Sequence, residues 1–225
     1  AIAVIGASDF ECRETGIGPN RFQSASVLVD SANQRLFVTD GPNNRILVFD
    51  IRPDQLQNDP DAIAVIGQQD FDSRVPGLSS SGLSRPGGVA LDHVNQRLFV
   101  GDNGNNRILV YDVHPDRFES NPEAIAVLGQ ADFVSRNPRQ SDTAIGPRSM
   151  SYDDATGRIM MSDSGNNRIL VYDVSPERMT NFPEPIGIIG QPDYETVTED
   201  RLTFDPEFAQ SKTFGPRITG GSISA

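Results

Sequence analysis

Three aspartates at equivalent positions are the residues best suited to chemistry. Each ends a short β-rich run and precedes an asparagine-rich turn; they are Asp40, Asp102 and Asp163. Gathered on one face, such carboxylates would suit Ca²⁺, which takes oxygen ligands, or a cationic ligand. Alternatively, each aspartate caps its own turn and pairs with the arginine that follows it, which is Arg45, Arg107 or Arg168. Recurrence in every copy favours the structural role, because a functional site usually breaks the symmetry of a repeat.

A second set of candidate binding residues is cationic. Arg148 and Arg217 follow a proline that opens a predicted strand, Arg85 precedes such a proline, and Arg21 lies upstream of the first copy. If these strands line a central channel, the arginines would form a cationic mouth for an acidic ligand or a carboxylate-bearing sugar. The competing interpretation is that they form salt bridges between neighbouring repeats.

Histidine and cysteine provide little metal or nucleophile chemistry. His93 and His114 are the only histidines and fall in different turns, so they do not supply the several histidines of a zinc set. Cys12 is the only cysteine, which excludes an internal disulfide, and it has no histidine nearby in the sequence. The sequence contains no Gly-x-Ser-x-Gly elbow, P-loop or His-Glu-x-x-His motif. We therefore predict no catalytic residues and no zinc site, which leaves Ca²⁺ as the one cofactor to consider.

The charge balance restricts the partners. The formal net charge is −12, and Lys212 is the only lysine. Nucleic acids and anionic membranes attract clustered Lys and Arg, so we expect no nucleic-acid partner. No apolar run approaches the roughly 20 residues of a membrane helix, so we expect no membrane insertion.

The elements that position these residues recur along the chain. The apolar segment Ala1-Ile-Ala-Val-Ile-Gly6 returns from Ala62, Ala124 and Pro185 with small changes. Asp40 to Asp102 spans 62 positions and Asp102 to Asp163 spans 61, which gives a period of about 61 residues.

Each repeat contains four short runs of β-branched and aromatic residues bounded by turn residues. In the second repeat the predicted strands are Val89–Asp92, Arg97–Gly101, Arg107–Asp112 and Ala124–Leu128. No segment shows a convincing 3.6-residue helical periodicity. Only the linker between the fourth strand and the next first strand varies in length, which is typical of repeats that pack only on their neighbours. The pattern predicts an all-β protein.

These repeats resemble the NHL family of β-propellers. Three segments are similar to its strand motifs: Pro86-Gly-Gly-Val-Ala-Leu-Asp92, Phe99-Val-Gly-Asp102 and Asn105-Asn-Arg-Ile108. The Gly-Gln-x-Asp-Phe tails at 67–71 and 129–133 are similar to those of a bacterial extracellular subset. The resemblance implies four-stranded antiparallel blades in a six-bladed ring, and an extracellular or periplasmic location.

The predicted blades form a single propeller segment over residues 1–225 that fills only part of such a ring. We expect a stray fourth strand at 1–6, complete blades at about 24–67, 86–129 and 147–190, and the first strand of a next blade at 214–225. Propellers close with roughly 4–8 blades. Either further sequence completes the arc, or a homodimer or a partner chain does.

Two functions are compatible with this organisation. The first is a non-enzymatic binding or scaffolding propeller whose linker-loop face contacts a protein or carbohydrate, because variable loops usually carry function. The alternative is a metal-dependent enzyme similar to the six-bladed lactonases and lyases, with its site at the central channel. RNA binding, as in some animal NHL domains, is disfavoured by the acidity of the chain.

Overall fold

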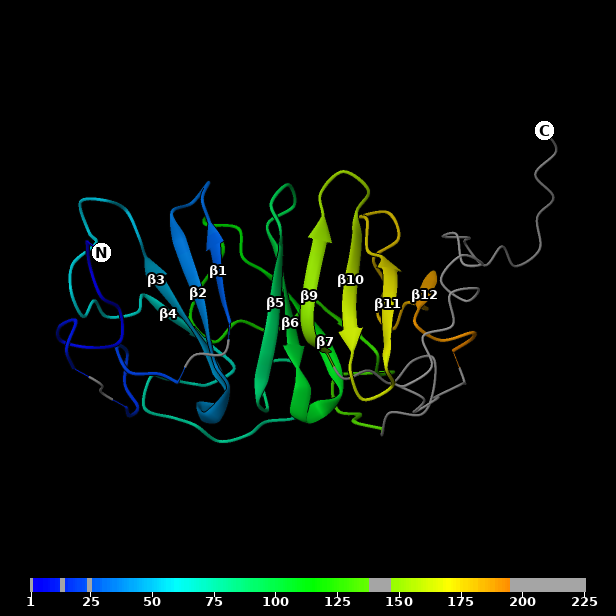
Figure 1. Cartoon of the computed structure of the whole chain (residues 1–225), viewed down its shortest axis with the longest axis horizontal. Coiled ribbons are helices and arrows are strands. Elements are labelled where there is room, and N and C mark those ends of the chain that lie inside the picture. The colour runs from blue at the N-terminus through cyan, green and yellow to red at the C-terminus, as the bar shows by residue number, and fades with distance from the viewer. Residues whose placement is uncertain (1, 13–14, 24–25, 138–146, 195–225) are drawn as a thin grey trace, which may run out of the picture.

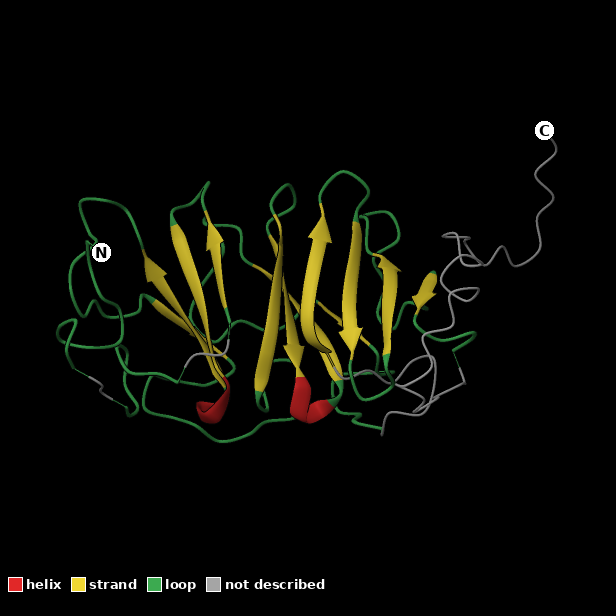
Figure 2. Ribbon diagram, in the orientation of Figure 1, coloured by secondary structure: helices red, strands yellow, loops and turns green. Residues whose placement is uncertain are grey.

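The protein forms three blades placed side by side. The computed structural model describes residues 2–12, 15–23, 26–137 and 147–194. These residues form three four-stranded antiparallel sheets (Figures 1 and 2). Helix within them is limited to two short 3₁₀ turns, and none of it has the length and hydropathy to cross a membrane. The fold is therefore the predicted all-β architecture, a partial β-propeller.

Strands that follow one another in sequence lie next to one another in each sheet. The first blade contains β1 (Val27–Asp30), β2 (Arg35–Asp40), β3 (Arg45–Asp50) and β4 (Ala64–Ile66). The second contains β5 (Pro86–Asp92), β6 (Arg97–Asp102), β7 (Arg107–Asp112) and β8 (Ala126–Leu128). The third contains β9 (Pro147–Asp153), β10 (Arg158–Asp163), β11 (Arg168–Asp173) and β12 (Gly187–Ile189). The strand β5 starts at Pro86, three residues before the predicted start at Val89. Proline is tolerated there because it occupies the first position of the strand.

A tight hairpin joins the second and third strands of every blade, with the strand-ending aspartate opposite the strand-opening arginine. In the first two blades the turn is a 3₁₀ helix, η1 (Gly41–Asn43) or η2 (Asn103–Asn105). Asn44 and Asn106 end these turns with φ of 57° and 54°, a left-handed conformation that asparagine tolerates. Figure 2 shows both turns on the same edge of the molecule as the linkers between blades. We call this edge the linker side and the opposite edge the turn side.

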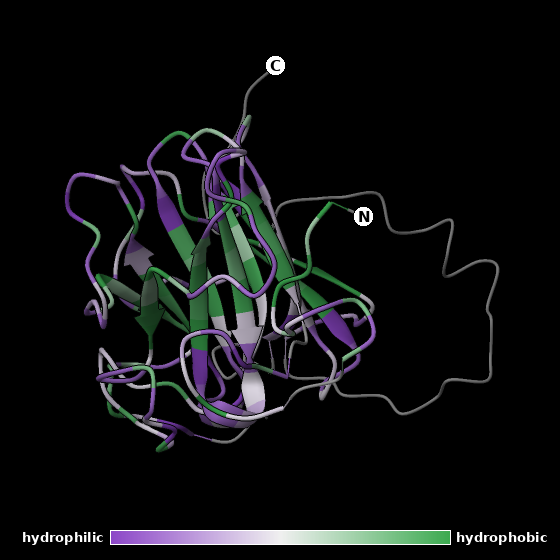
Figure 3. Ribbon diagram, turned by 90° about the vertical axis from the view of Figure 1, so that its left-hand side faces the viewer, coloured by the Kyte–Doolittle hydropathy of each residue, from purple (hydrophilic) through white to green (hydrophobic). Residues whose placement is uncertain are grey.

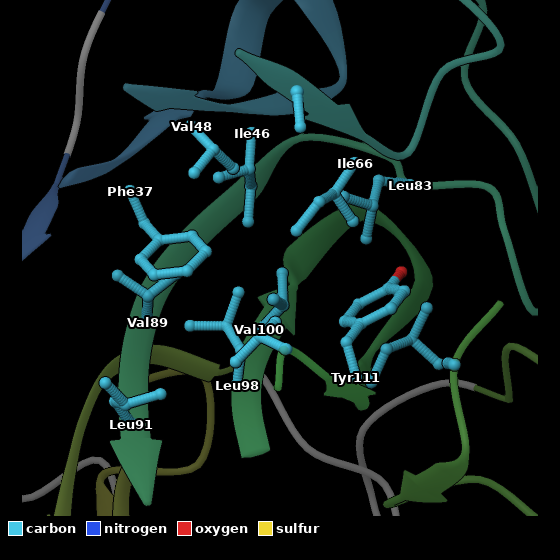
Figure 4. Packing of buried hydrophobic residues seen from close by; sticks show 14 of the residues in the cluster. Phe37, Ile46, Val48, Ile66, Leu83, Val89, Leu91, Leu98, Val100 and Tyr111 are labelled. Carbon is cyan, nitrogen blue, oxygen red and sulfur yellow. The ribbon is translucent and has the colours of Figure 1, made fainter. Parts of the chain in front are cut away.

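The hydrophobic core lies between the blades, because alternate residues of a strand point to opposite faces of its sheet. Phe37 of the first blade packs against Val89 and Leu91 of the second (Figure 4). Phe99 of the second blade stacks on Tyr152 of the third, with ring centroids 5.5 Å apart. Figure 3 shows the same division, with hydrophobic colour along the strands and hydrophilic colour at their ends and in the loops. Each blade is thus held mainly by apolar contact with its neighbour.

One side of the first blade is only partly covered. Val27 and Val29 of β1 are 61% and 46% exposed, whereas the equivalent residues of the second blade are buried against the first. Farther out on the same side, Ile5 and Phe22 pack on the outer strands of the blade. The segment before the first blade therefore covers its outer part and leaves its inner strand open.

The predicted fourth strand at residues 1–6 needs a correction. The described part, residues 2–6, forms no strand ladder, because no third strand lies beside it among the described residues. The expected first strand at 214–225 lies outside the described residues. The expected blade limits of 24–67, 86–129 and 147–190 enclose the observed strands.

Two glycines allow a close approach between the second and third blades. A Cβ atom on Gly101 would lie 2.5 Å from the carbonyl oxygen of Pro147, and one on Gly88 would lie 2.9 Å from that of Arg148. In the first and third blades, both equivalent positions are occupied by residues with a hydroxyl group. The backbone N–H of the one in the first strand donates to the hydroxyl oxygen of the one in the second strand. The glycines therefore serve the contact between the second and third blades.

Replacing Gly101 with alanine should push the third blade away from the second. We expect Gly101→Ala to lower the free energy of unfolding by about 1–3 kcal/mol, the usual cost of overpacking a tight contact. Urea unfolding followed by circular dichroism measures this. Gly187→Ala is the control, because its Cβ would have only an ordinary contact, 3.5 Å from Val171. An equal loss in both variants would contradict the assigned role of Gly101.

Candidate functional site

Three buried groups of aspartate, asparagine and arginine lie at the linker side, one in each blade. We call them the linker-side clusters: Asp40–Asn43–Arg45, Asp102–Asn105–Arg107 and Asp163–Asn166–Arg168. The aspartate ends the second strand, the asparagine lies in the turn and the arginine opens the third strand. The carboxylate accepts hydrogen bonds from asparagine Nδ2 at 2.8–2.9 Å and from arginine Nε at 2.7–2.9 Å. The structure thus brings together each aspartate and arginine that the sequence paired.

The arginine of each linker-side cluster also fixes linker backbone. Arg45 donates to the carbonyl oxygens of Gly18 and Arg21, at 3.0 and 2.8 Å, in the segment that leads into the first blade. Its Nη1 donates to the carbonyl of Phe71, in the tail that leaves the blade. Arg107 and Arg168 likewise donate to a backbone carbonyl in the tail that leaves their own blade. Arg107 also donates to two carbonyls of the linker that enters the second blade. One guanidinium therefore fastens the chain on both sides of a blade.

Burial and pairing act in opposite directions on Asp102. Removal from water raises the pKa of this carboxyl, while Arg107, Asn105 and the N–H of Ser84, 2.7 Å away, favour the charged form. The Arg107 side chain is also fully buried. Breaking such a pair by removing one member leaves an uncompensated charge inside the protein. The pair therefore depends on the presence of both partners.

The structure does not gather the three aspartates Asp40, Asp102 and Asp163 into one site. Each lies in its own blade and is engaged by its own asparagine and arginine. Across the described ranges, no group of three or more His, Cys, Asp or Glu residues is placed to hold a metal ion. The Ca²⁺ hypothesis gains no support from this geometry.

Sequence reasoning missed a second set of clusters, on the turn side. We call these the turn-side clusters: Asp30–Asn33–Arg35 and Asp92–Asn95–Arg97. Arg35 continues across the blade boundary to the carbonyl of Val113, at 2.8 Å, and to Oε1 of Gln96. The signal was present in the sequence, because Asp-x-x-Asn-x-Arg occurs twice in each of the first two repeats.

The turn-side carboxylates are held in the charged form. For Asp92, burial acts to raise the pKa, but hydrogen bonds from Asn95 and Arg97 outweigh it and lower the pKa. Asp30 behaves in the same way, with burial opposed by Arg35 and Asn33. In the second blade, the carboxyl at the turn side thus has a lowered pKa, whereas burial raises the pKa of Asp102 at the linker side.

Of the cationic candidates, Arg85 and Arg148 are exposed at the linker ends of β5 and β9. Arg85 has φ of 48°, and its backbone N–H donates to Asn44 Oδ1 of the first blade at 2.9 Å. Arg21 is instead committed to a salt bridge with Asp59, at 2.6 Å. Arg217 lies outside the described residues. Two of the four predicted arginines are therefore presented to solvent on the linker side.

The two histidines lie in separate connections on the turn side. His93 Nδ1 lies 2.9 Å from Asp154 Oδ2, across the boundary between the second and third blades. His114 lies 3.8 Å from Asp116. Cys12 is exposed, in the segment before the first blade. These residues do not converge on one site.

Removing one buried arginine should cost far more stability than removing an exposed one. We expect Arg107→Met to lower the free energy of unfolding by about 3–5 kcal/mol, because Asp102 is left buried without its cation. Arg117→Ala is the control: it breaks a pair with Asp112 whose arginine is 61% exposed, and should cost far less stability because water screens an exposed ion pair. Urea unfolding of the two variants checks this. Similar losses would show that burial of the pair is unimportant.

The turn-side cluster of Asp92 should make stability depend on acidity. Its pKa in the folded protein lies below the ordinary value of 3.8, so its contribution is present above that value and is lost as the pH falls through the folded pKa. We expect the stability difference between wild type and Asp92→Asn to be constant from pH 7 to about pH 5 and to shrink below about pH 4. Urea unfolding at a series of pH values measures it. A difference that grows on acidification would contradict the assignment.

The sequence profile of the NHL repeat matches residues 83–111, which include β5, β6 and most of β7. No curated protein matches the chain. The structure called U3-55K is similar in fold, with a TM-score of 0.50, 12% identity and coverage of 81% of this chain and 42% of that one. At this identity the likeness concerns the fold alone.

Two structures of enzymes also match the chain. Hydrazine synthase of Kuenenia stuttgartiensis gives a TM-score of 0.49 at 15% identity, covering 84% of this chain and 41% of that one. A putative 6-phosphogluconolactonase from Bacteroides uniformis gives 0.47 at 15% identity, covering 74% and 42%. This chain thus spans about two fifths of the length of these proteins. The match at residues 83–111, inside one of three equivalent blades, supports the NHL-repeat family for this chain.

Proposed function

We propose that this protein is a non-enzymatic binding or scaffolding propeller that contacts a protein or carbohydrate through its linker side. The observation that carries the proposal is the internal use of the linker-side clusters. Their carboxylates and guanidinium groups bond to one another and to linker backbone, so the polar residues common to all blades serve the scaffold. The surface available for recognition is then the set of linkers that these arginines hold in place.

The linker surface combines apolar and charged groups. Val75 and Val134 are 73% and 65% exposed in the two tails that follow β4 and β8. In the same tails, hydrogen bonds from Ser73 to Asp70 and from Ser135 to Asp132 lower the pKa of each carboxyl and fix the position of its charge. Exposed apolar side chains beside fixed charges are a composition that suits protein recognition.

The inner edge of the linker side adds positive charge. Arg85 and Arg148 are exposed there, at the start of β5 and β9. Their guanidinium groups suit the carboxylates of an acidic protein segment or an acidic sugar, because the planar fork can bind a carboxylate through two hydrogen bonds. In this proposal they orient the partner, and the linker valines supply apolar contact. Completion of the ring by a homodimer or partner chain, and an extracellular or periplasmic location, belong to the same proposal.

Paired valine substitutions test which side binds. The 225-residue protein would be applied to arrays of bacterial polysaccharides and of extracellular protein domains. We expect Val75→Ser with Val134→Ser to weaken binding to the recognised ligand about tenfold, as loss of an apolar contact in an interface does. Val94→Ser is the matched control, because Val94 is 75% exposed in the turn between β5 and β6, on the turn side. Equal weakening by the control, or turnover of a bound ligand, would overturn the proposal.

A further inference from the structure

Asn44 places two exposed arginines from different segments beside each other on the linker side. This asparagine ends the turn η1 and is 8% exposed. Its Nδ2 donates to the carbonyl oxygen of Arg74, in the tail of the first blade, at 2.9 Å. Its Oδ1 accepts from the backbone N–H of Arg85, at the entry to the second blade, at 2.9 Å. Because one side-chain amide holds both backbones, the two arginine side chains leave the protein from adjacent points.

The loop that carries Arg74 is fixed by a second side-chain amide. Gln68 Nε2 donates to the carbonyl oxygen of Val75 at 2.9 Å, and Gln68 Oε1 accepts from the N–H of Val75 at 3.0 Å. Within this loop Asp70 closes a turn by accepting from backbone N–H groups two and three residues on. The backbone at Arg74 is therefore held in place before a ligand arrives, which reduces the entropy lost on binding.

The guanidinium groups of Arg74 and Arg85 have no carboxylate partner and no hydrogen bond within the part of the chain that the structure describes, and both residues are exposed. Arg21, by contrast, is paired with Asp59. Asp72 is exposed two residues before Arg74 but forms no ion pair with it. Two cations that leave the surface from adjacent points raise the local positive potential, and such a place attracts an anion.

The backbone of Arg85 is strained. Its φ of 48° lies in the left-handed region that residues other than glycine rarely adopt. A residue before a proline, as Arg85 is before Pro86, normally takes an extended conformation. The equivalent position of the third repeat is Gly146, and glycine tolerates a positive φ. Strain of this kind is characteristic of functional sites. We attribute the arginine at this position to a use of its guanidinium group.

We propose that Arg74 and Arg85 together bind a doubly charged oxyanion, a phosphate monoester carried by the ligand of the linker side. Each guanidinium group can donate two parallel hydrogen bonds to phosphate oxygens. The two positive charges match the charge of a monoester, which is close to −2 at neutral pH. Val75, which is 73% exposed and follows Arg74, is placed to contact the carrier of the phosphate. This inference rests on the proposed function, because it assigns a chemical group to the same surface.

Titration of the 225-residue protein with inorganic phosphate at about pH 8, where phosphate is mainly a dianion, tests this site. The NMR signals of the guanidinium carbons report the contact. We expect saturable shifts for Arg74 and Arg85, and about tenfold weaker binding of acetate, which has one charge, at equal ionic strength. O-phosphoserine and a hexose monophosphate should both displace inorganic phosphate. Their relative affinity distinguishes a protein carrier from a sugar carrier.

Two substitutions separate binding from folding. Arg74→Gln and Arg85→Gly should each weaken phosphate binding about tenfold, since one of two charged donors is lost. Arg85→Gly should not lower the free energy of unfolding in urea, because glycine suits a φ of 48°. Arg178→Gln is the control with an equal change in charge, because the Arg178 side chain is 71% exposed on the turn side. It should leave the phosphate affinity unchanged.

The proposal is overturned by absence of saturable phosphate shifts, by equal affinities for phosphate and acetate, by failure of the two monoesters to displace phosphate, or by an equal loss in Arg178→Gln. A loss of stability in Arg85→Gly would also overturn it, because the arginine would then serve the fold. If the paired valine substitutions weaken ligand binding but phosphate does not bind, this inference alone is wrong. If phosphate binds at Arg74 and Arg85 but the valine substitutions have no effect, the proposed function alone is wrong.

Discussion

The buried bond between a strand-ending aspartate and the arginine that opens the next strand is the interaction on which this structure depends. In the first blade it joins Asp40 to Arg45 with both side chains fully buried. Burial of two charges is costly unless every polar atom has a partner. Here the remaining donors of the arginine are met by linker carbonyls, including those of Gly18 and Arg21. The requirement to satisfy a buried guanidinium therefore fixes the path of a linker that has no regular structure of its own.

The same requirement explains how the blades are joined. Apolar side chains supply most of the contact between sheets, as Phe37 does against Val89, but apolar packing has little direction. Hydrogen bonds that cross a blade boundary supply the direction. On the turn side Arg35 reaches Val113 of the next blade, and on the linker side the N–H of Arg85 reaches Asn44 of the blade before. The first and second blades are thus tied at both ends.

This use of polar residues bears on function. Residues that recur in each blade are engaged inside the scaffold, so their charge is not free to act on a ligand. Exposed residues such as Val75, Arg85 and Arg148 differ from blade to blade, and the clusters hold the segments around them in place. A rigid support for variable loops is an arrangement suited to binding, because less conformational entropy is lost when a partner is engaged.

The sequence by itself determined the fold class, the 61-residue period, the limits of the three blades and the pairing of Asp102 with Arg107, because all of these follow from local patterns and fixed spacing. It predicted a strand at residues 1–6 because this segment repeats in the fourth strands, but a strand ladder needs a partner, and only the tertiary structure showed that Val4 bonds to Asn58 with no third strand beside it among the described residues. The tertiary structure also decided that Arg21 is paired whereas Arg85 and Arg148 are exposed, because exposure depends on what the next blade covers. Spacing along the chain fixes contacts inside a blade, whereas contacts between blades depend on how whole sheets pack.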